Sequence, residues 1–373
     1  MKQIYLDSAA TTCLRQEVID AMIAVLQTEF GNPSSTHTFG RNSKSLIETS
    51  RKTIAKYLGC QSKEIIFTSS GTEGTNMILT SCVRDLGVQR IVTSRAEHHA
   101  TLYTVLHLQK QYGIEIEYVN LLSNGSIDYQ QLEQILQNEK PTLVSLMHIN
   151  NEIGTQLDIH KTGSICRKHQ ALFHCDTVQS VGKTEFNLAE LPVDFIVASA
   201  HKFHGPKGVG FAYINKNVSL KPSILGGEQE KGLRAGTEAV HQIVGMAKAV
   251  ELAYETLENE RDYISKLKEY SLKKITEIFS ETKVNGENTF YNILNVRLPI
   301  PQDKAAMILF SLDIKGIAVS RGSACQSGSV KPSHVLQQIL SEEELKKPSL
   351  RISFSHYNSI EEIDYFIACL KEV

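Results

Sequence analysis

The chain has 373 residues, 41% of them hydrophobic and 21% charged, with a formal net charge of -2. This length predicts two or three folded units with a sizeable core. The charges form no basic block, which argues against nucleic acid as a direct ligand, and no apolar run approaches the roughly 18 residues of a membrane span. The start, MKQIYLDSAATT, lacks the apolar run of a secretion signal, so we expect a cytoplasmic protein.

Short β-rich runs alternate with helical patterns between residues 64 and 214. Seven runs, rich in β-branched residues and bounded by turn formers, predict strands at 64–69, 90–94, 114–120, 142–147, 171–176, 194–199 and 208–214. Helices are expected between several of them, at 98–112, 127–138 and 158–170. This alternation is typical of an α/β domain with a mostly parallel sheet.

A second, smaller α+β unit is predicted after this domain. Apolar residues at helical spacing predict one long connecting helix at 245–281. Beyond it the pattern predicts strands at 292–298, 316–320 and 349–354, and helices at 303–313 and 360–372. No Pro/Gly/Ser-rich linker separates the two units, so we expect them to pack together.

The seven cysteines show no CxxC spacing and are odd in number, at positions 13, 60, 82, 166, 175, 325 and 369. This distribution argues against a disulfide framework and against a zinc site, and no metal site is predicted. Most of these cysteines are expected to be small buried hydrophobic residues. Cys325 differs, because small residues surround it.

The stretch TSSGTEGTN (68–76) follows a predicted strand and opens a helix. Such a small-residue turn offers free backbone N–H groups and the positive helix end to an anion such as phosphate. The alternative is an ordinary helix cap by Ser70 or Thr72. The stretch is neither a GxGxxG nor a P-loop motif, so a nucleotide-binding fold is not indicated.

Two later segments place reactive side chains at strand ends, where open α/β sheets bind ligands. Asp176 and Gln179 in FHCDTVQSVGK suit a protonated heterocyclic nitrogen and its neighbourhood, although Asp176 is equally well placed to cap a helix. Lys202 in SAHKFHGPKG suits a Schiff base, the alternative being a solvated loop lysine. Together with the anion-binding turn they match the phosphate, ring nitrogen and aldehyde of pyridoxal 5'-phosphate.

At this point the chain resembles a known family. The motifs YLDSAATT, GNPSS, SSGTEGTN, EHHA, NNEIG, HCDTVQSVGK, SAHKFHGPKGVG, RAGTEAVHQIVGM, RGSACQSG and SLRISF occur in order and span nearly its whole length. They are similar to those of cysteine desulfurases of the NifS/IscS type, which are fold-type-I pyridoxal-phosphate enzymes of the class V aminotransferase family. The resemblance implies a large cofactor domain at 15–253 with a mostly parallel seven-stranded sheet between helices. It implies a small α+β domain formed by 1–14 and 254–373, which carries the cysteine loop.

The resemblance also assigns cofactor residues by motif. Lys202 would hold the cofactor covalently, Asp176 would face the ring nitrogen, and Gln179 the ring hydroxyl. The phosphate would be bound by Gly71, Thr72, Ser199 and His201. In homodimeric relatives the threonine of RAGT reaches the phosphate of the other subunit, which implies a homodimer in which Thr237 does so.

Three further roles follow from the same resemblance. His98 would stack on the ring and handle protons, while His99 is interpreted as a structural neighbour. Asn151 would lie near the ring hydroxyl and the substrate carboxylate. Arg351 would bind that carboxylate, a bidentate task that suits a guanidinium.

Cys325 lies in SRGSACQSGSVKPS (320–333), a run of small residues between a predicted strand and a helix expected near His334. As thiolate it would attack the sulfur of L-cysteine and leave alanine and a persulfide on Cys325. The alternative is an incidental loop thiol. The implied partner is a sulfur-acceptor protein, either an iron-sulfur scaffold or a sulfur relay that serves thiolation. The sequence ends at CLKEV, without the C-terminal extension that many relatives use to dock the scaffold.

Two departures and two rival interpretations complete the prediction. Cys13 stands where the family usually has proline. The sequence SFSHYNS (353–359) replaces a motif of the SxGRxT type, a change expected to reshape the mouth of the site. The nearest rival is a selenocysteine lyase or another fold-type-I lyase or aminotransferase, which would not need the Cys325 thiol. A non-catalytic scaffold is disfavoured by the retention of every reacting group: Lys202, Asp176, His98, Cys325 and Arg351.

Overall fold

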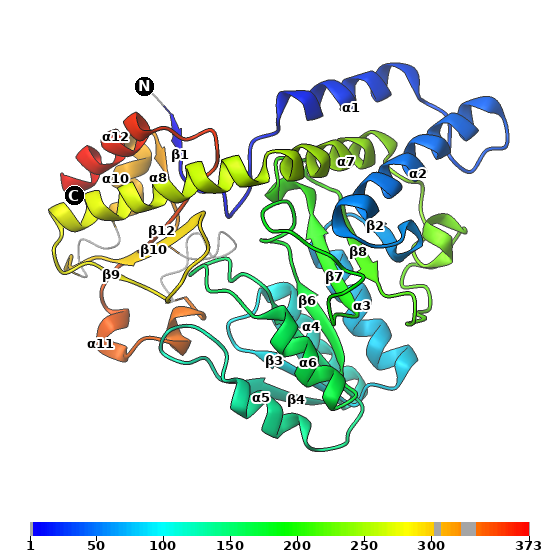
Figure 1. Ribbon diagram of the computed structural model, residues 1–373, viewed down its shortest axis with the longest axis horizontal. Coiled ribbons are helices and arrows are strands. Elements are labelled where there is room, and N and C mark those ends of the chain that lie inside the picture. The colour runs from blue at the N-terminus through cyan, green and yellow to red at the C-terminus, as the bar shows by residue number, and fades with distance from the viewer. Residues whose placement is uncertain (1–2, 302–306, 322–332, 373) are drawn as a thin grey trace.

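The computed structural model describes residues 3–301, 307–321 and 333–372. Its main feature is a seven-stranded sheet in which only β8 runs against its neighbours (Figure 1). The strand order is β2 (Ile65–Thr68), β8 (Gly210–Ile214), β7 (Phe195–Ser199), β6 (Leu172–Asp176), β5 (Thr142–Met147), β3 (Arg90–Ser94) and β4 (Glu115–Val119). The seven predicted strands and the mostly parallel α/β sheet are confirmed.

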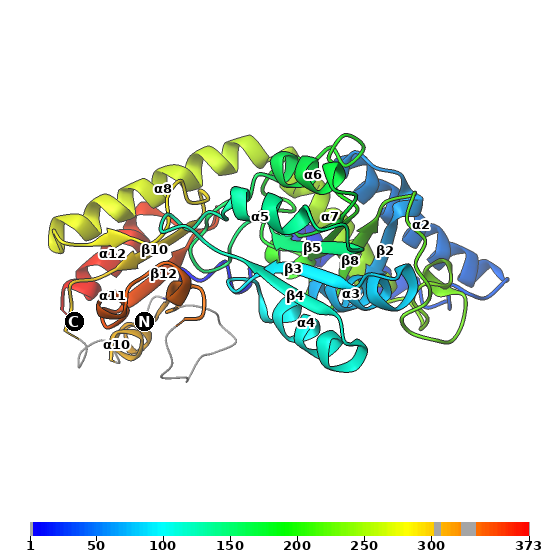
Figure 2. The same cartoon turned by 90° about the horizontal axis from the view of Figure 1, so that it is seen from below.

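Helices cover both faces of this sheet (Figure 2). One face carries α3 (Gly71–Leu86) and α4 (His99–Tyr112), and the other carries α5 (Tyr129–Leu136), α6 (Ile159–Lys168) and α7 (Val240–Glu255). Two N-terminal helices, α1 (Gln16–Thr28) and α2 (Thr38–Leu58), pack against α7. Each face buries its own apolar cluster, which explains why the strands are apolar on both sides. The three helices predicted between strands are confirmed.

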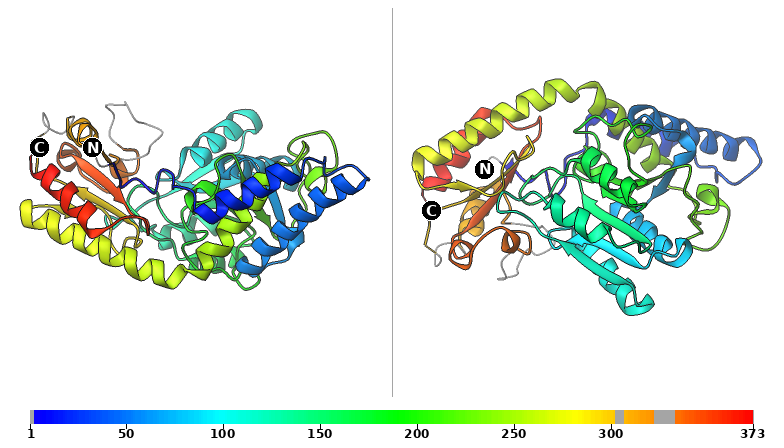
Figure 3. Two further views of the ribbon diagram at one scale, coloured as in Figure 1. Left: turned by 90° about the horizontal axis from the view of Figure 1, so that it is seen from above. Right: turned by 60° about the horizontal axis from the view of Figure 1, so that its bottom comes forward.

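The C-terminal unit has its own apolar core. Its three-stranded sheet has the order β12 (Ser349–Ser353), β10 (Ile293–Arg297) and β9 (Lys283–Val284), and β1 (Ile4–Tyr5) pairs with β11 (Ile317–Ala318). The helices are α8 (Leu257–Ile278), α10 (Ile308–Ile314), α11 (Glu342–Leu345) and α12 (Ile360–Lys371). Figure 3 shows β1 and α12 at the same end of the molecule. The N-terminal residues therefore belong spatially to the C-terminal unit.

The prediction of one long helix at 245–281 is wrong. Two helices, α7 and α8, meet at Thr256, whose backbone (φ -106°, ψ 3°) leaves the helical region. The Thr256 hydroxyl donates to Leu252 O at 2.9 Å and lies 2.7 Å from Glu260 Oε1. A threonine that hydrogen-bonds back to the preceding turn bends a helix, and apolar spacing does not reveal this. The helix expected near His334 is a short 3-10 helix, Leu336–Gln338.

No helix within the described residues is both long and apolar enough to cross a membrane.

Candidate active site

A cavity of about 260 Å³ lies at the carboxyl ends of the parallel strands. Ten of the twelve predicted site residues line it: Gly71, Thr72, His98, Asn151, Asp176, Gln179, Ser199, His201, Lys202 and Arg351. They follow β2, β3, β5, β6 and β7 in the chain, except Arg351, which comes from β12 of the C-terminal unit. The cavity thus brings both units of the chain to one place, at the edge where open α/β sheets bind ligands.

The turn before α3 forms one end of the cavity. Ser70 caps the helix, because its Oγ accepts the Glu73 N–H at 3.2 Å, so the predicted cap exists. The backbone N–H groups of Gly71 and Thr72 have no acceptor among the described residues. A Cβ on Gly71 would lie 2.5 Å from Val178 Cγ2, so only glycine fits this close approach. The turn is both a helix cap and a surface of N–H donors for an anion.

Asp176 is the last residue of β6 and is buried. Its Oδ1 accepts the Val178 N–H at 3.0 Å, so it caps a turn and not one of the described helices. Burial raises the pKa of this carboxyl, while the Val178 N–H and the charge of Lys202 oppose the rise. A cationic ring nitrogen beside Asp176 would compensate the buried charge.

Gln179 is held at both ends of its side-chain amide. Its Nε2 donates to Ala9 O at 2.8 Å, and its Oε1 lies 3.4 Å from Lys183 Nζ, which donates to it. Because a lysine only donates and a carbonyl only accepts, these two contacts fix which end of the amide is which. The second N–H of Nε2 therefore remains available to a ligand in the cavity.

Lys202 lies in a 3-10 turn directly after β7. Its Nζ donates to Ala9 O and to Ala10 O, both at 2.8 Å. The neighbouring His201 interacts through Nδ1 with Thr11 Oγ1 at 3.1 Å. Lys202 is therefore not the solvated loop lysine of the alternative interpretation.

His98 caps α4 through its ring. Nδ1 accepts the Ala100 N–H at 3.1 Å, which leaves the ring proton on Nε2. Burial and then the charge of Lys202 lower the pKa of His98 to about 4. At neutral pH His98 is therefore an uncharged N–H donor. His99 does not line the cavity; it stacks on Tyr103 and contacts the His334 ring at a tilt, as expected of a structural neighbour.

Arg351 is only 1% exposed and has two fixed partners. One terminal nitrogen donates to Asn151 O at 2.8 Å and the other to Asp7 Oδ1 at 2.7 Å. Its Nε is buried without a partner among the described residues. The guanidinium thus keeps unused N–H groups beside the cavity.

The two remaining predicted residues are not in the cavity. Cys325 lies outside the described residues. Thr237 is exposed and is not among the residues that line the cavity. The departures near the C-terminus also lie elsewhere: His356 is 3.2 Å from Glu260 and its ring contacts that of His204 at a tilt, and no described residue of 353–359 lines the cavity.

Two contributors were missed from the sequence, the carbonyls of Ala9 and Ala10 and the carboxylate of Asp7. Carbonyl groups occur at every residue, so no side-chain pattern marks them. Asp7 belongs to the motif YLDSAATT, but its contact with Arg351 spans 344 positions, so no local pattern marks it.

Glu97, which precedes His98 in the chain, is expected to make the stability of the protein depend on pH. Burial raises its pKa to about 8, and the nearby charge of Asp176 adds to the rise. Because the folded state holds this proton more tightly, Glu97 lowers the free energy of unfolding progressively from about pH 4.5 to about pH 8. The same effect favours the neutral form of Glu97 at pH 7.

We therefore expect Glu97→Gln to gain stability over the native protein as pH rises from 5 to 8.5, by at most about 5 kcal/mol. The amide keeps the acceptor for the Ser94 hydroxyl, which lies 2.9 Å from Glu97 Oε1. Urea unfolding of both proteins at several pH values measures the difference. A difference that does not change with pH would contradict the buried, protonated state.

The cavity fits pyridoxal 5'-phosphate in its donor set. It offers unsatisfied N–H groups at a helix start, a buried carboxylate lacking a hydrogen-bonded cation among the described residues, and a lysine amine in its wall. These are the groups that the phosphate, the ring nitrogen and the aldehyde require. No cluster of three or more His, Cys, Asp or Glu side chains suited to a metal occurs in the described part of the chain.

Comparisons with known proteins agree with this geometry. The family described as Aminotransferase class-V matches residues 4–366. Cysteine desulfurase IscS of Dictyoglomus turgidum is 41% identical over 374 residues, which cover 100% of this chain and 94% of the relative. Putative cysteine desulfurase IscS 1 of Bacillus subtilis is 38% identical over 369 residues, which cover 97% and 96%.

Solved structures show the same likeness. A structure described as a NifS-like protein aligns with a TM-score of 0.92 at 35% identity, covering 100% of this chain and 99% of that chain. A structure of SspA in complex with cysteine aligns with a TM-score of 0.82 at 31% identity, covering 96% and 100%. The fold is therefore that of the fold-type-I pyridoxal-phosphate enzymes, and the chain belongs to the class V aminotransferase family and, within it, to the cysteine desulfurases of the NifS/IscS type.

Proposed function

We propose that this cysteine desulfurase takes sulfur from L-cysteine onto Cys325, leaves L-alanine, and passes the sulfur to an acceptor protein. The observation that carries the proposal is the convergence of Lys202, Asp176 and Arg351 on one cavity, although Asp176 ends one strand of the large sheet, Lys202 follows another, and Arg351 lies in the small sheet. An amine, a buried carboxylate and a carboxylate-binding guanidinium are what an amino-acid substrate and pyridoxal 5'-phosphate need.

The cofactor residues follow from the cavity. Lys202 would bind pyridoxal 5'-phosphate covalently, Asp176 would face its ring nitrogen, and the free N–H of Gln179 its ring hydroxyl. The phosphate would meet the N–H groups of Gly71 and Thr72, with Ser199 and His201 beside them. When bound, the cofactor supplies an electron sink that lowers the cost of breaking bonds at the substrate Cα.

The chain's own groups then have distinct tasks. Arg351 binds the substrate carboxylate with its unused N–H groups, and Asn151 lies beside it. The amine of Lys202, once released, is held by the carbonyls of Ala9 and Ala10 and moves the proton of Cα. His98, an uncharged ring, donates from Nε2.

Cys325 acts as the sulfur acceptor. Its thiolate attacks the substrate sulfur, an S–S bond forms as the Cβ–S bond breaks, and the electron pair of that bond leaves with the carbon fragment. The fragment takes up protons and becomes alanine. The outer sulfur of the persulfide is then transferred to a partner protein, either an iron-sulfur scaffold or a sulfur relay.

We also propose a homodimer in which Thr237 serves the partner's site. Thr237 is exposed, and the preceding residues are fixed by two ion pairs, Arg51 with Glu230 at 2.7 Å and Arg234 with Glu73 at 2.8 Å. The same part of the molecule exposes large apolar side chains, among them Leu225 at 84%. A rigid segment beside exposed apolar residues supports an interface there.

The test of the function is a paired measurement on the purified protein. With L-cysteine and a thiol reductant we expect sulfide and alanine in equal amounts, and a yellow protein that loses its colour when the cofactor is removed. A colourless protein that does not bind added pyridoxal 5'-phosphate would contradict the cofactor assignment. A yellow protein that transfers the amino group of cysteine to an oxo acid without releasing sulfide would favour an aminotransferase.

A further inference from the structure

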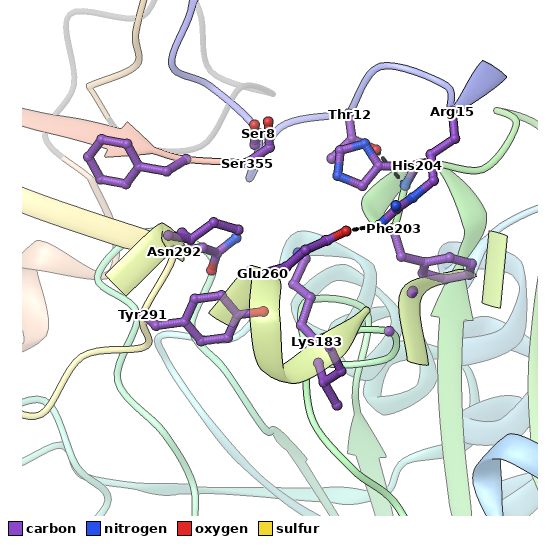
Figure 4. A pocket seen from close by; sticks show the side chains of 15 residues that line it. Ser8, Thr12, Arg15, Lys183, Phe203, His204, Glu260, Tyr291, Asn292 and Ser355 are labelled. Carbon is purple, nitrogen blue, oxygen red and sulfur yellow. Dashed lines mark hydrogen bonds and ion pairs between the residues drawn. The ribbon is translucent and has the colours of Figure 1, made fainter. Parts of the chain in front are cut away.

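The N-terminal segment Asp7–Thr12 links the two units at the cavity. Toward the C-terminal unit, Ala9 N–H donates to Ser353 Oγ at 2.8 Å. Toward the large sheet, Thr12 N–H donates to His201 O at 2.9 Å, and the carbonyls of Ala9 and Ala10 hold Lys202. Figure 4 shows this segment running from Ser8 past Thr12 to Arg15. The segment thus touches residues that bind the cofactor and residues that bind the substrate.

Asp7 is the charged residue of this segment, and it contacts Arg351, the proposed carboxylate-binding residue. Its carboxylate is 2.7 Å from Arg351, and it is 16% exposed, whereas Arg351 is 1% exposed. Asp7 does not line the cavity, so it lies behind the guanidinium as seen from the ligand. It therefore acts on a substrate only through Arg351.

Two contacts on different nitrogens fix the plane of the Arg351 guanidinium. Asn151 O holds one terminal nitrogen and Asp7 Oδ1 the other. Three N–H groups are thereby left for a ligand: the N–H of the buried Nε, which has no partner among the described residues, and the second N–H of each terminal nitrogen. A bidentate contact with a carboxylate requires the planar guanidinium to be held in one orientation. Without fixed partners, a long arginine side chain adopts many orientations.

We propose that Asp7 is a positioning residue for substrate selection: it orients Arg351 so that the free N–H groups meet the carboxylate of an amino acid. The proposal rests on the proposed role of Arg351 as the carboxylate-binding residue. It identifies the placement of the Asp7 oxygen, and not its charge alone, as the property that the site requires.

Two substitutions separate placement from charge. Asp7→Asn keeps an acceptor oxygen in the same place and removes the charge, whereas Asp7→Glu keeps the charge and moves the oxygen by one methylene. We expect Asp7→Glu to bind L-alanine about tenfold more weakly, as loss of a hydrogen bond to a charged group predicts, and Asp7→Asn to stay within about threefold of the native value. Both variants retain a polar side chain of similar size, so both are expected to fold.

The measurement uses the holoenzyme and L-alanine, which has the carboxylate but no sulfur to transfer, with ethylamine as the probe that lacks the carboxylate. Dissociation constants come from calorimetry and from the change in cofactor absorption. We expect ethylamine to bind the native protein and both variants equally. For L-cysteine, we expect Asp7→Glu to raise KM with kcat changed by less than about threefold, because the lost interaction concerns binding.

The matched control is Glu260→Gln. Glu260 forms a comparable ion pair with Arg15, at 2.6 Å with 9% and 19% exposure, and Figure 4 shows the two side chains facing each other. Glu260 does not line the cavity. We expect this control to lower the melting temperature without changing the affinity for L-alanine.

Each outcome has one meaning. Equal losses of L-alanine affinity in both Asp7 variants, no loss in either, a loss confined to Asp7→Asn, or a parallel loss of ethylamine binding would overturn the positioning role. Failure of the proposed function is recognised separately with Arg351→Met: if that variant binds L-alanine like the native protein, Arg351 does not bind the carboxylate at all.

Discussion

Replacing Lys202 by alanine is expected to lower sulfide release from L-cysteine by about 10³-fold or more, because in the proposed function one amine both binds the cofactor and moves a proton. The structure places this amine in the wall of the cavity, 2.8 Å from each of two carbonyl oxygens. No other described lysine lines that cavity. The measurement is sulfide and alanine release at saturating pyridoxal 5'-phosphate.

The covalent role has its own readout. After borohydride reduction, the native protein should keep the cofactor through denaturation, as a mass increase on the peptide that contains Lys202, and Lys202→Ala should not. Lys207→Ala is the matched control, since Lys207 lies in the same glycine-rich turn but is exposed and does not line the cavity. Full activity of Lys202→Ala, or loss of the covalent cofactor in Lys207→Ala, would show that the lysine has been assigned incorrectly.

Much of the fold was predictable from the sequence, because the apolar runs and the turn-forming residues mark the same strands that the structure buries. Each strand of the large sheet is a short apolar run between turn formers, and the chain after β2, β3, β6 and β7 places a polar or reactive residue where the strand ends. Asp176 and Lys202 were predicted in this way, since Asp176 ends β6 and Lys202 comes shortly after β7. Because parallel strands end at the same edge of the sheet, these residues were expected to lie around one cavity.

The remaining features depend on contacts that sequence spacing does not encode. The bend at Thr256 arises from a hydroxyl that bonds to the preceding turn, and the apolar spacing continues across it. The support of Lys202 comes from backbone carbonyls of Ala9 and Ala10, almost two hundred positions away. Asp7 and Arg351 meet because the N-terminal segment joins the C-terminal unit, through β1 beside β11 and through the bridge between Asp7 and Ser353.

The chain on both sides of Cys325 is attached beside the cavity. Ser320 is paired through its backbone with Arg351, at 3.1 and 2.6 Å. On the other side, Ser333 donates to the Glu152 carboxylate, and His334 Nε2 donates to Glu97 O at 2.9 Å. Cys325 itself lies outside the described residues, and the described chain on either side of it thus ends at residues that contact Arg351, Glu152 and Glu97.

Cys325→Ser is expected to lower sulfide release by about 10²-fold or more while the protein stays yellow, because it removes the proposed sulfur acceptor and leaves the proposed cofactor residues in place. Cys13→Ser is the matched control: Cys13 is exposed, unlike the buried Cys82, Cys166, Cys175 and Cys369, and it does not line the cavity. After a single turnover with L-cysteine, mass spectrometry should find an added sulfur atom on Cys325 in the native protein and in Cys13→Ser. If Cys325→Ser released sulfide as fast as the native protein, sulfur would leave the substrate without this thiol, and the reaction would be that of a lyase, in which no persulfide on the chain is needed.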